Sequence, residues 1–123
     1  MRLKTAQPIF GFEDIDEFIF ERIDDFFCTI SSGDISFTMI DPLSVRDYSF
    51  VVDSAYKEIL EVSDESDIKV YNIVTLRNPI ENSTINFLAP IVVNEKKGLL
   101  AQIVLDEKKY PDFGLKEEIK NYL

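Results

Sequence analysis

The sequence predicts an all-β fold: a single antiparallel β-barrel-like domain over residues 1–123, with one or two short helices. Apolar and polar side chains alternate in at least five segments, which is the period of strands with one buried face. The chain has 123 residues, 46% of them hydrophobic, enough for one packed core. No proline-, glycine- or serine-rich boundary divides it. Many short strands with few helices favour a barrel or a sandwich.

The first strand signals lie at residues 17–21, 26–31 and 35–39. In each of them, apolar side chains recur at every second position. The Ser-Gly-Asp sequence at 32–34 is suited to a turn between the second and third segments. The Asp-Pro pair at 41–42 ends the third, because proline cannot donate a hydrogen bond to a sheet. We therefore expect three antiparallel strands here.

A short helix is expected over Ser54–Glu61. Asp53 is a suitable N-cap, and Ala55 and Ile59 share one face of this helix. The Ser-Asp-Glu-Ser-Asp sequence at 63–67 then predicts an acidic surface loop.

The longest strand signal follows at residues 68–76. A second long apolar stretch runs from 85 to 93, and Pro90 within it marks a sheet edge, a bulge or a barrel corner. The turn residues at 94–98 can close a hairpin onto a strand over 99–105.

The end of the chain has helical rather than strand spacing. Its apolar side chains recur at i, i+4 and i+8 after a glycine, which predicts an amphipathic helix over 115–123.

The charge balance points to a basic partner. The net charge is −10, and such a chain repels phosphate backbones, so direct binding of nucleic acid is disfavoured. The excess of acidic residues is confined to the first half of the chain. Residues 1–67 carry 16 acidic and 5 basic side chains, whereas residues 68–123 carry 7 acidic and 8 basic ones. An acidic first half suits a protein that binds something basic.

Several chemistries are excluded by composition. The chain has no histidine, which removes histidine-dependent nucleophilic catalysis and most zinc sites. Its single cysteine, Cys28, cannot form an internal disulfide, and the start of the chain lacks the apolar run of a signal peptide. No stretch is long and apolar enough to span a membrane, and no glycine-rich loop precedes a lysine. We expect a cytoplasmic protein without cofactor or metal.

Acidic side chains are dense at residues 13–25, so catalysis by a carboxylate pair has to be considered. The sequence shows that acidic residues are dense here, but not that two carboxyl groups meet in one cleft. Runs of charged residues usually lie in water. A carboxylate-based hydrolase or a carbohydrate-binding β domain is therefore the alternative to a protein-binding function. A cleft with two inward carboxyl groups of perturbed pKa would favour the hydrolase.

Some residues in apolar surroundings are expected to be structural. Cys28 should be a small buried apolar residue. Asn72 and Gln102 interrupt apolar faces, and we expect their amides to bond neighbouring backbone. The 15 phenylalanine and tyrosine side chains mostly fall at strand spacing, which predicts core positions for them.

One long segment and several shorter ones follow the pattern of a known protein family. The longest is Ser-Thr-Ile-Asn-Phe-Leu-Ala-Pro-Ile-Val-Val-Asn at 83–94. The others are 11–13, 37–42, 47–50, 72–74 and 102–105, with Tyr110. Through these segments, nearly the whole chain resembles the FliW family of bacterial flagellar assembly factors. Phe10 stands where that family often has proline before the Gly-Phe-Glu signature at 11–13.

The resemblance implies a cytoplasmic, non-catalytic protein with a barrel-like fold. Members of the family bind flagellin and also CsrA, an RNA-binding translational repressor. A member bound to CsrA relieves repression of flagellin translation, and unsecreted flagellin sequesters the member and frees CsrA. We expect this protein to be a monomer when free, to use no cofactor, and to bind neither nucleic acid nor membrane directly. The candidate partner-binding residues are Asp14, Asp16, Glu17, Glu21, Asp64, Glu65, Asp67 and Asn86.

Overall fold

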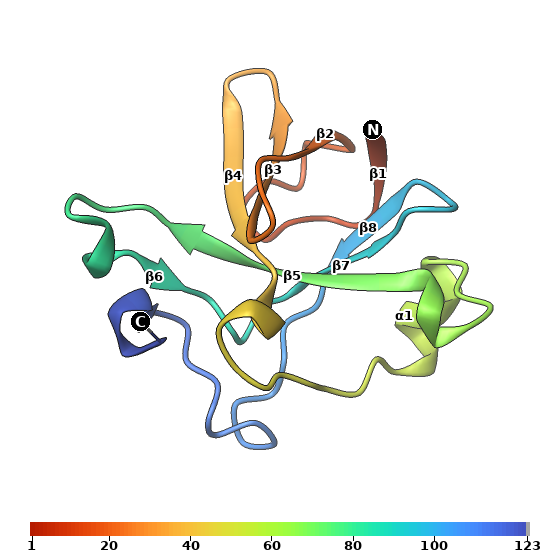
Figure 1. Cartoon of the computed structure of the whole chain (residues 1–123). Coiled ribbons are helices and arrows are strands. Elements are labelled where there is room, and N and C mark those ends of the chain that lie inside the picture. The colour runs from red at the N-terminus through yellow and green to blue at the C-terminus, as the bar shows by residue number, and fades with distance from the viewer. Residues whose placement is uncertain (123) are drawn as a thin grey trace.

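Seven strands close into a barrel in the computed structural model, which describes residues 1–122 (Figure 1). The order around the barrel is β4-β3-β2-β1-β8-β7-β5, and β5 returns to pair with β4. Two short strands, β6 and β9, extend from β5 beyond this closure. The strand bounds are β1 Arg2–Gln7, β2 Glu17–Arg22, β3 Phe27–Ser32, β4 Ile35–Ile40, β5 Ile68–Thr75, β6 Thr84–Ile85, β7 Ile91–Asn94, β8 Leu99–Gln102 and β9 Glu117–Glu118.

The helices are short, as predicted. The α-helix α1 spans Ser54–Ile59, and the 3-10 turns are η1 Pro42–Ser44, η2 Glu65–Asp67, η3 Ile80–Asn82 and η4 Ile119–Tyr122. In the described part of the chain no helix is long and apolar enough to cross a membrane. The all-β prediction is confirmed, with one addition: β1 and β8 pair in parallel, whereas the other paired strands are antiparallel.

Local sequence explains the strands β2 to β4. The β3–β4 hairpin turns at Gly33, whose φ of +57° is rarely adopted by residues with a side chain, so that Ser32 pairs with Ile35. The Asp24 carboxylate accepts the N–H groups of Phe26 and Phe27, both at 2.8 Å, and so shapes the turn between β2 and β3. The predicted alternation is confirmed where these strands enclose the core.

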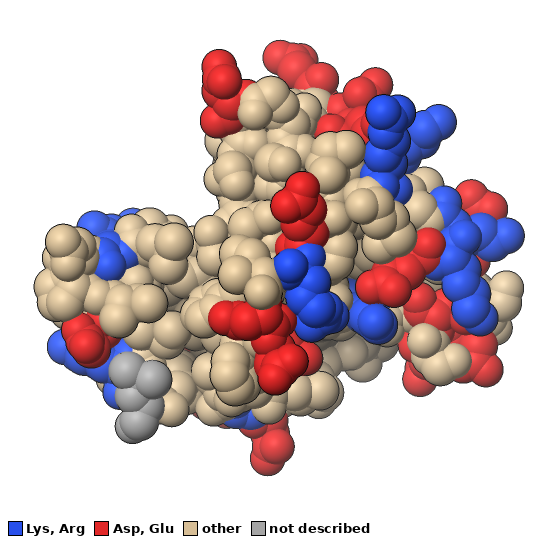
Figure 2. All heavy atoms as spheres, turned by 45° about the horizontal axis from the view of Figure 1, so that its top comes forward, with Lys and Arg blue, Asp and Glu red and all other residues tan. Residues whose placement is uncertain are grey.

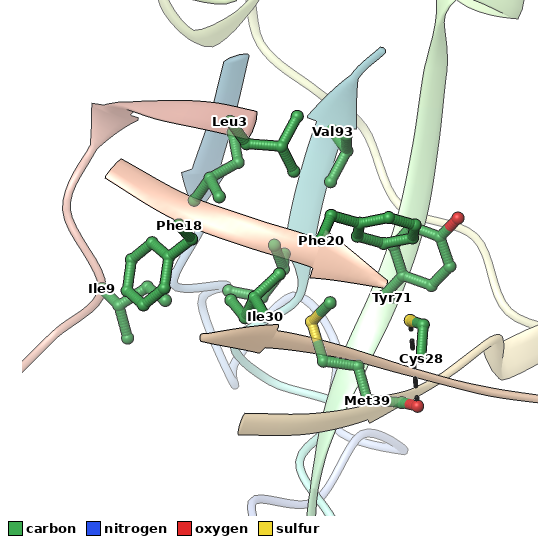
Figure 3. Close-up of a cluster of buried hydrophobic side chains, with 11 residues drawn as sticks. Leu3, Ile9, Phe18, Phe20, Cys28, Ile30, Met39, Tyr71 and Val93 are labelled. Atoms are coloured by element: carbon green, nitrogen blue, oxygen red, sulfur yellow. Dashed lines mark hydrogen bonds between the residues drawn. The ribbon is translucent and has the colours of Figure 1, made fainter. Parts of the chain in front are cut away.

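The interior of the barrel is a cluster of apolar side chains from all seven strands (Figure 3). Cys28 is buried in it, as predicted, and lies near Met39. Burial raises the pKa of the Cys28 thiol to about 11. Two further clusters lie outside the barrel wall. One packs beneath α1, and the other packs between β6 and the C-terminal segment.

The helix α1 begins as predicted, because the Asp53 carboxylate accepts the Tyr56 N–H at 3.2 Å. Its buried face differs from the predicted one. Ile59 is 40% exposed, whereas Leu60, just beyond the helix, is fully buried and packs with the partly buried Tyr56. A helix of six residues, fewer than two turns, is too short for its i, i+4 spacing to define the packed face.

The predicted C-terminal helix over 115–123 is wrong for the described residues. Residues 117–118 form β9 against β6, and residues 119–122 form a 3-10 turn; Leu123 lies outside the described residues. The carboxylate of Glu117 accepts the Gly114 N–H at 2.6 Å and a hydrogen bond from the Tyr122 hydroxyl. These bonds favour an irregular turn. On the predicted apolar face, Ile119 is buried, whereas Leu115 is 57% exposed.

Two other features depart from the sequence analysis. The strand β1 was not predicted, because Leu3 is its only large apolar residue and its neighbours Arg2 and Lys4 are charged. The apolar stretch at 85–93 forms two strands, β6 and β7, separated by an irregular segment that ends at Pro90. Its side chains Ile85, Phe87, Ile91 and Val93 are nevertheless fully buried.

Candidate functional site

An apolar groove of about 420 Å³ adjoins the interior cluster of the barrel, against which its lining residues Phe12, Phe37 and Ile73 pack. Six separate segments of the chain meet there. The residues that line this apolar groove are Ile9, Phe10, Phe12, Phe37, Ile73, Asn86, Ala89, Gln102, Val104 and Leu115.

Three apolar side chains on the groove are exposed to solvent. Phe10 is 81% exposed, Val104 66% and Leu115 57%. They come from the loop after β1, from the segment after β8 and from the C-terminal segment, so only the folded chain brings them together. Single exposed apolar residues are common, but three of them around one groove indicate a surface that binds an apolar partner.

The loop between β1 and β2 directs two phenylalanines to different places. Gly11 has a φ of +89°, which allows a sharp turn between Phe10 and Phe12. Phe12 packs inward with its ring edge-on to Phe37, at a centroid distance of 5.0 Å. Phe10 points outward beside the groove, which corrects the expectation that its ring belongs to the core.

Gln102 fixes one wall of the groove. Its Oε1 accepts the N–H of Phe10 at 2.7 Å, and its Nε2 donates to the carbonyl of Ala89 at 3.4 Å. The side chain is only 7% exposed, so these bonds satisfy an amide that would otherwise be costly to bury. The expectation that Gln102 bonds neighbouring backbone is confirmed.

Asn86 also lines the groove, and Asn72 supports it from behind the lining. The Oδ1 of Asn86 accepts the N–H groups of Leu88 and Ala89 at 3.0 and 3.1 Å, which turns the chain before Pro90. The Nδ2 of Asn72 donates to the Asn86 carbonyl at 2.9 Å. Asn72 is therefore bonded to backbone, as predicted, although its Oδ1 has no partner among the described residues.

Tyr48 extends this network away from the groove. Its hydroxyl donates to the carbonyl of Phe87 and accepts from the Nδ2 of Asn72 at 3.3 Å. Burial raises the pKa of Tyr48 to about 12, so the hydroxyl keeps its proton at neutral pH and remains a donor.

The seven candidate acidic residues do not form one patch with Asn86. Asp14 and Asp16 lie in the loop that follows the groove residue Phe12, whereas Glu17 and Glu21 lie on β2. Asp64, Glu65 and Asp67 lie in and before η2. On the face shown in Figure 2, acidic and basic side chains are interspersed. The structure thus brings only Asn86 into the groove, and the partner-binding role of the acidic residues stays a prediction.

Several of these acidic side chains have local partners. Asp67 pairs with Lys96 at 3.1 Å, and Glu65 pairs with Lys57 at 3.4 Å. Asp64 and Asp67 also form the capping box of η2. Hydrogen bonds with Lys96 and with backbone N–H groups lower the pKa of Asp67, and a bond from the Ser66 N–H lowers that of Asp64.

The alternative of a carboxylate-based hydrolase gains no support from these groups. The carboxyl groups with shifted pKa values are Glu13, Asp24, Asp64 and Asp67. All four shift downward, chiefly because they accept hydrogen bonds, whereas a general acid needs a raised pKa. Among residues 1–122, no three acidic or cysteine side chains are placed to hold a metal ion together.

Three of the segments that carry the family resemblance contribute residues to the lining of the groove. Phe12 comes from the segment at 11–13, Asn86 and Ala89 from that at 83–94, and Gln102 from that at 102–105. Sequence analysis missed the exposed residues Phe10, Val104 and Leu115. The available signal was that Phe10 stands directly before the segment at 11–13 and that Val104 lies within the segment at 102–105.

Comparison with known proteins gives consistent results. The family model described as FliW protein matches residues 2–115. The chain is 40% identical over 127 residues to the flagellar assembly factor FliW of Campylobacter lari, covering 100% of this chain and 97% of that protein. It is 37% identical over 126 residues to flagellar assembly factor FliW 1 of Wolinella succinogenes, with 100% and 98% covered. A crystal structure of the flagellar assembly factor FliW superposes with a TM-score of 0.86 at 27% identity, covering 96% of this chain and 84% of that one.

Proposed function

The chain belongs to the FliW family, and on that premise we propose that it is a non-catalytic flagellar assembly factor that binds flagellin and CsrA in turn. In this mechanism it binds CsrA while flagellin is scarce and so relieves repression of flagellin translation. Unsecreted flagellin then occupies the protein and releases CsrA. One FliW-like domain over residues 1–123 performs both roles in the cytoplasm, without a cofactor, and is a monomer when free.

The observation that carries this proposal is the apolar groove with its three exposed apolar side chains. Flagellin's termini form amphipathic helices in the filament, and the apolar face of such a helix is suited to a groove. Burying the ring of Phe10, now 81% exposed, would contribute about 1.5–3 kcal/mol to binding. The groove is therefore the site we assign to flagellin.

CsrA is assigned to the acidic residues of the loop between β1 and β2. Asp14 and Asp16 follow the groove residue Phe12 along the chain, so a basic partner held there would overlap the flagellin site. Their charges would act mainly on the association rate. We expect the association rate with CsrA to fall as salt rises from low to physiological ionic strength. An association rate independent of salt would exclude this electrostatic role.

The switch is tested by titrating flagellin into a preformed complex of this protein with CsrA. We expect flagellin to displace CsrA, because overlapping sites cannot be filled together. Light scattering or analytical ultracentrifugation would follow the masses present. A stable ternary complex with unchanged affinity for CsrA would contradict the switch mechanism.

The flagellin site is tested by Phe10→Ser. This variant keeps the backbone N–H that bonds Gln102, so the fold should be preserved. We expect its affinity for flagellin to fall about tenfold or more. The matched control is Ile23→Ser, since Ile23 is 60% exposed but lies after β2, outside the residues that line the groove. Equal affinities of Phe10→Ser and Ile23→Ser for flagellin would contradict binding of flagellin in the groove.

The contact role of Asn86 is tested separately. Its Oδ1 accepts two backbone N–H groups, so Asn86→Ala should lower the free energy of unfolding by about 1–3 kcal/mol. Full stability together with lost partner binding would support a direct contact. Reduced stability with normal affinity of the remaining folded protein would assign Asn86 a structural role alone.

A further inference from the structure

The closure of the barrel leaves part of one strand edge open. β4 and β5 are joined by three residue pairs, from Thr38–Val74 to Ile40–Asn72. Asp41 and Pro42 then lead the chain into η1, so that β5 continues past the end of β4 toward α1 (Figure 1). On its other edge, this continuation, Ile68–Tyr71, pairs with β7.

The direction of the backbone groups identifies which of them face the open edge. The Ile73 carbonyl accepts the Asn86 N–H and so points toward β6 and β7. These directions alternate along an antiparallel strand. The backbone N–H and C=O of Tyr71 therefore also point toward β7, whereas those of Val70 point the other way, toward the open edge. Val70 lies beyond the residues that pair with β4, and outside the strand ladders its N–H and C=O form no hydrogen bond within residues 1–122.

A trough lies directly against this edge. It consists of two adjoining cavities of about 380 and 320 Å³, which share Tyr48, Ile68 and Val70. Four consecutive residues, Ile68–Tyr71, line the first cavity, although successive side chains of a strand point to opposite faces. The cavity therefore faces the edge of β5 rather than one of its faces. We call these two cavities the edge trough.

Among the described residues, two polar groups beside the edge trough lack a hydrogen-bond or ion-pair partner. The Tyr71 side chain is 3% exposed, yet its hydroxyl has no hydrogen bond among the described residues. In Figure 3 this hydroxyl points away from the apolar cluster. Arg22 lines the same cavity and forms no ion pair within residues 1–122. The other charged groups there are engaged: Lys69 pairs with Glu95 at 3.4 Å, and the Asp41 carboxylate accepts the Leu43 N–H at 3.0 Å.

We propose that the edge trough binds an extended peptide segment of a partner protein as an added strand beside Ile68–Tyr71. Main-chain hydrogen bonds to Val70 would hold the peptide, as in other cases of strand addition. One carboxylate-bearing side chain would accept hydrogen bonds from the Tyr71 hydroxyl and Arg22. Apolar side chains on the other face would contact Tyr48 and Ile68. This site is separate from the groove assigned to flagellin.

The test uses a synthetic probe: a capped seven-residue peptide of alternating valine and threonine with a central aspartate. Residue-resolved amide exchange by NMR is measured with and without millimolar peptide. We expect exchange at the Val70 N–H to slow about tenfold or more, because it gains an acceptor. Exchange at the Tyr71 N–H should not change, since it already faces β7. Tyr71 thus provides a control within the same strand.

The variant Tyr71→Phe tests the carboxylate contact. It keeps the ring that packs against Phe20 and removes only an unpartnered hydroxyl, so the fold should be preserved. We expect affinity for the aspartate peptide to fall about three- to tenfold, with no change for a peptide carrying central alanine.

Four outcomes would overturn the inference. Three of them are unchanged Val70 exchange at millimolar peptide, equal slowing at Val70 and Tyr71, and equal loss of affinity for both peptides in Tyr71→Phe. Protection of Val70 that appears without peptide and rises with protein concentration would assign the edge to a second copy of this chain, which also contradicts the proposal. Neither flagellin nor CsrA is used, so a failure here leaves the proposed function standing.

Discussion

Replacing Asn72 by aspartate tests how the wall of the apolar groove is held. The Asn72 side chain is fully buried, and its Nδ2 donates to the Asn86 carbonyl at 2.9 Å and to the Tyr48 hydroxyl at 3.3 Å. Asn72→Asp keeps the shape but turns the donor into an acceptor, so an ionised carboxylate would face the Asn86 carbonyl. A buried charge without a partner is strongly unfavourable, and we expect the pKa of this aspartate to rise until it stays protonated in the folded protein.

The magnitude follows from the linkage between protonation and folding. An aspartate in the unfolded chain has a pKa of about 3.9, and each pH unit corresponds to about 1.4 kcal/mol. Keeping the acid protonated in the folded state therefore costs about 4 kcal/mol at pH 7 and about 1.5 kcal/mol at pH 5. Because the folded pKa is raised, the loss of stability begins near the unfolded pKa and grows as pH rises. Total stabilities are about 5–15 kcal/mol, so the variant should fold detectably better at pH 5.

Urea unfolding of both proteins at pH 5, 6 and 7 would measure this difference. The matched control is Asn82→Asp, because Asn82 is exposed in η3 and the change should cost less than about 0.5 kcal/mol at each pH. A loss in Asn72→Asp below about 1 kcal/mol at pH 7, or one that does not change with pH, would refute the role given to the Asn72 amide.

Three other predictions concern single side chains. Glu61 has a φ of +54°, so Glu61→Gly should raise the free energy of unfolding by about 1 kcal/mol in urea, whereas Glu61→Val should lower it. The Cys28 thiol, with a pKa raised to about 11, should react with a thiol reagent at pH 8 at least about a hundredfold more slowly in the native than in the urea-unfolded protein. The guanidinium of Arg46 lies 5.1 and 5.2 Å from the ring centroids of Phe87 and Phe113 and pairs with Glu117 at 3.5 Å. Arg46→Met should therefore speed amide exchange at residues 113–119 about tenfold, with exchange in β2 as the unaffected control.

Features set by neighbouring residues were predictable from the sequence. The Asp53 cap, the turn at Gly33 and the end of β4 before Pro42 each depend on a few consecutive residues. The strand β1 was missed for the opposite reason: its pairing with β8 joins residues about a hundred positions apart, and its own pattern is mostly polar. The C-terminal prediction failed because helical spacing counts apolar positions but not the hydrogen bonds of the Glu117 side chain, which favour another turn.

The candidate site was predictable only in part. Asn86 and Gln102 stand in recognisable motifs, and their role in bonding backbone follows from the cost of burying an unpaired amide. The groove itself depends on six segments that meet only in the fold, so no sequence window contains it. Phe10 shows the limit most clearly, because its exposure follows from the turn at Gly11 and not from its hydrophobicity.

The hydrogen-bond network of Asn72 also bears on how one small domain could switch between partners. Exchange requires either overlapping sites or a coupling free energy between separate ones. Asn72 bonds Tyr48, which lines the edge trough, and Asn86, which lines the apolar groove, so a contiguous set of hydrogen bonds joins the two surfaces. Coupling through this set must be reciprocal: a peptide in the edge trough that weakens flagellin binding must itself be weakened by flagellin to the same factor. Measuring both affinities in the wild type and in Tyr48→Phe, which removes the hydroxyl shared with Asn72, would separate coupling from simple overlap. If the hydrogen bonds couple the two sites, the factor by which each ligand weakens binding of the other should fall in the variant. If the two ligands simply overlap, this factor should not change.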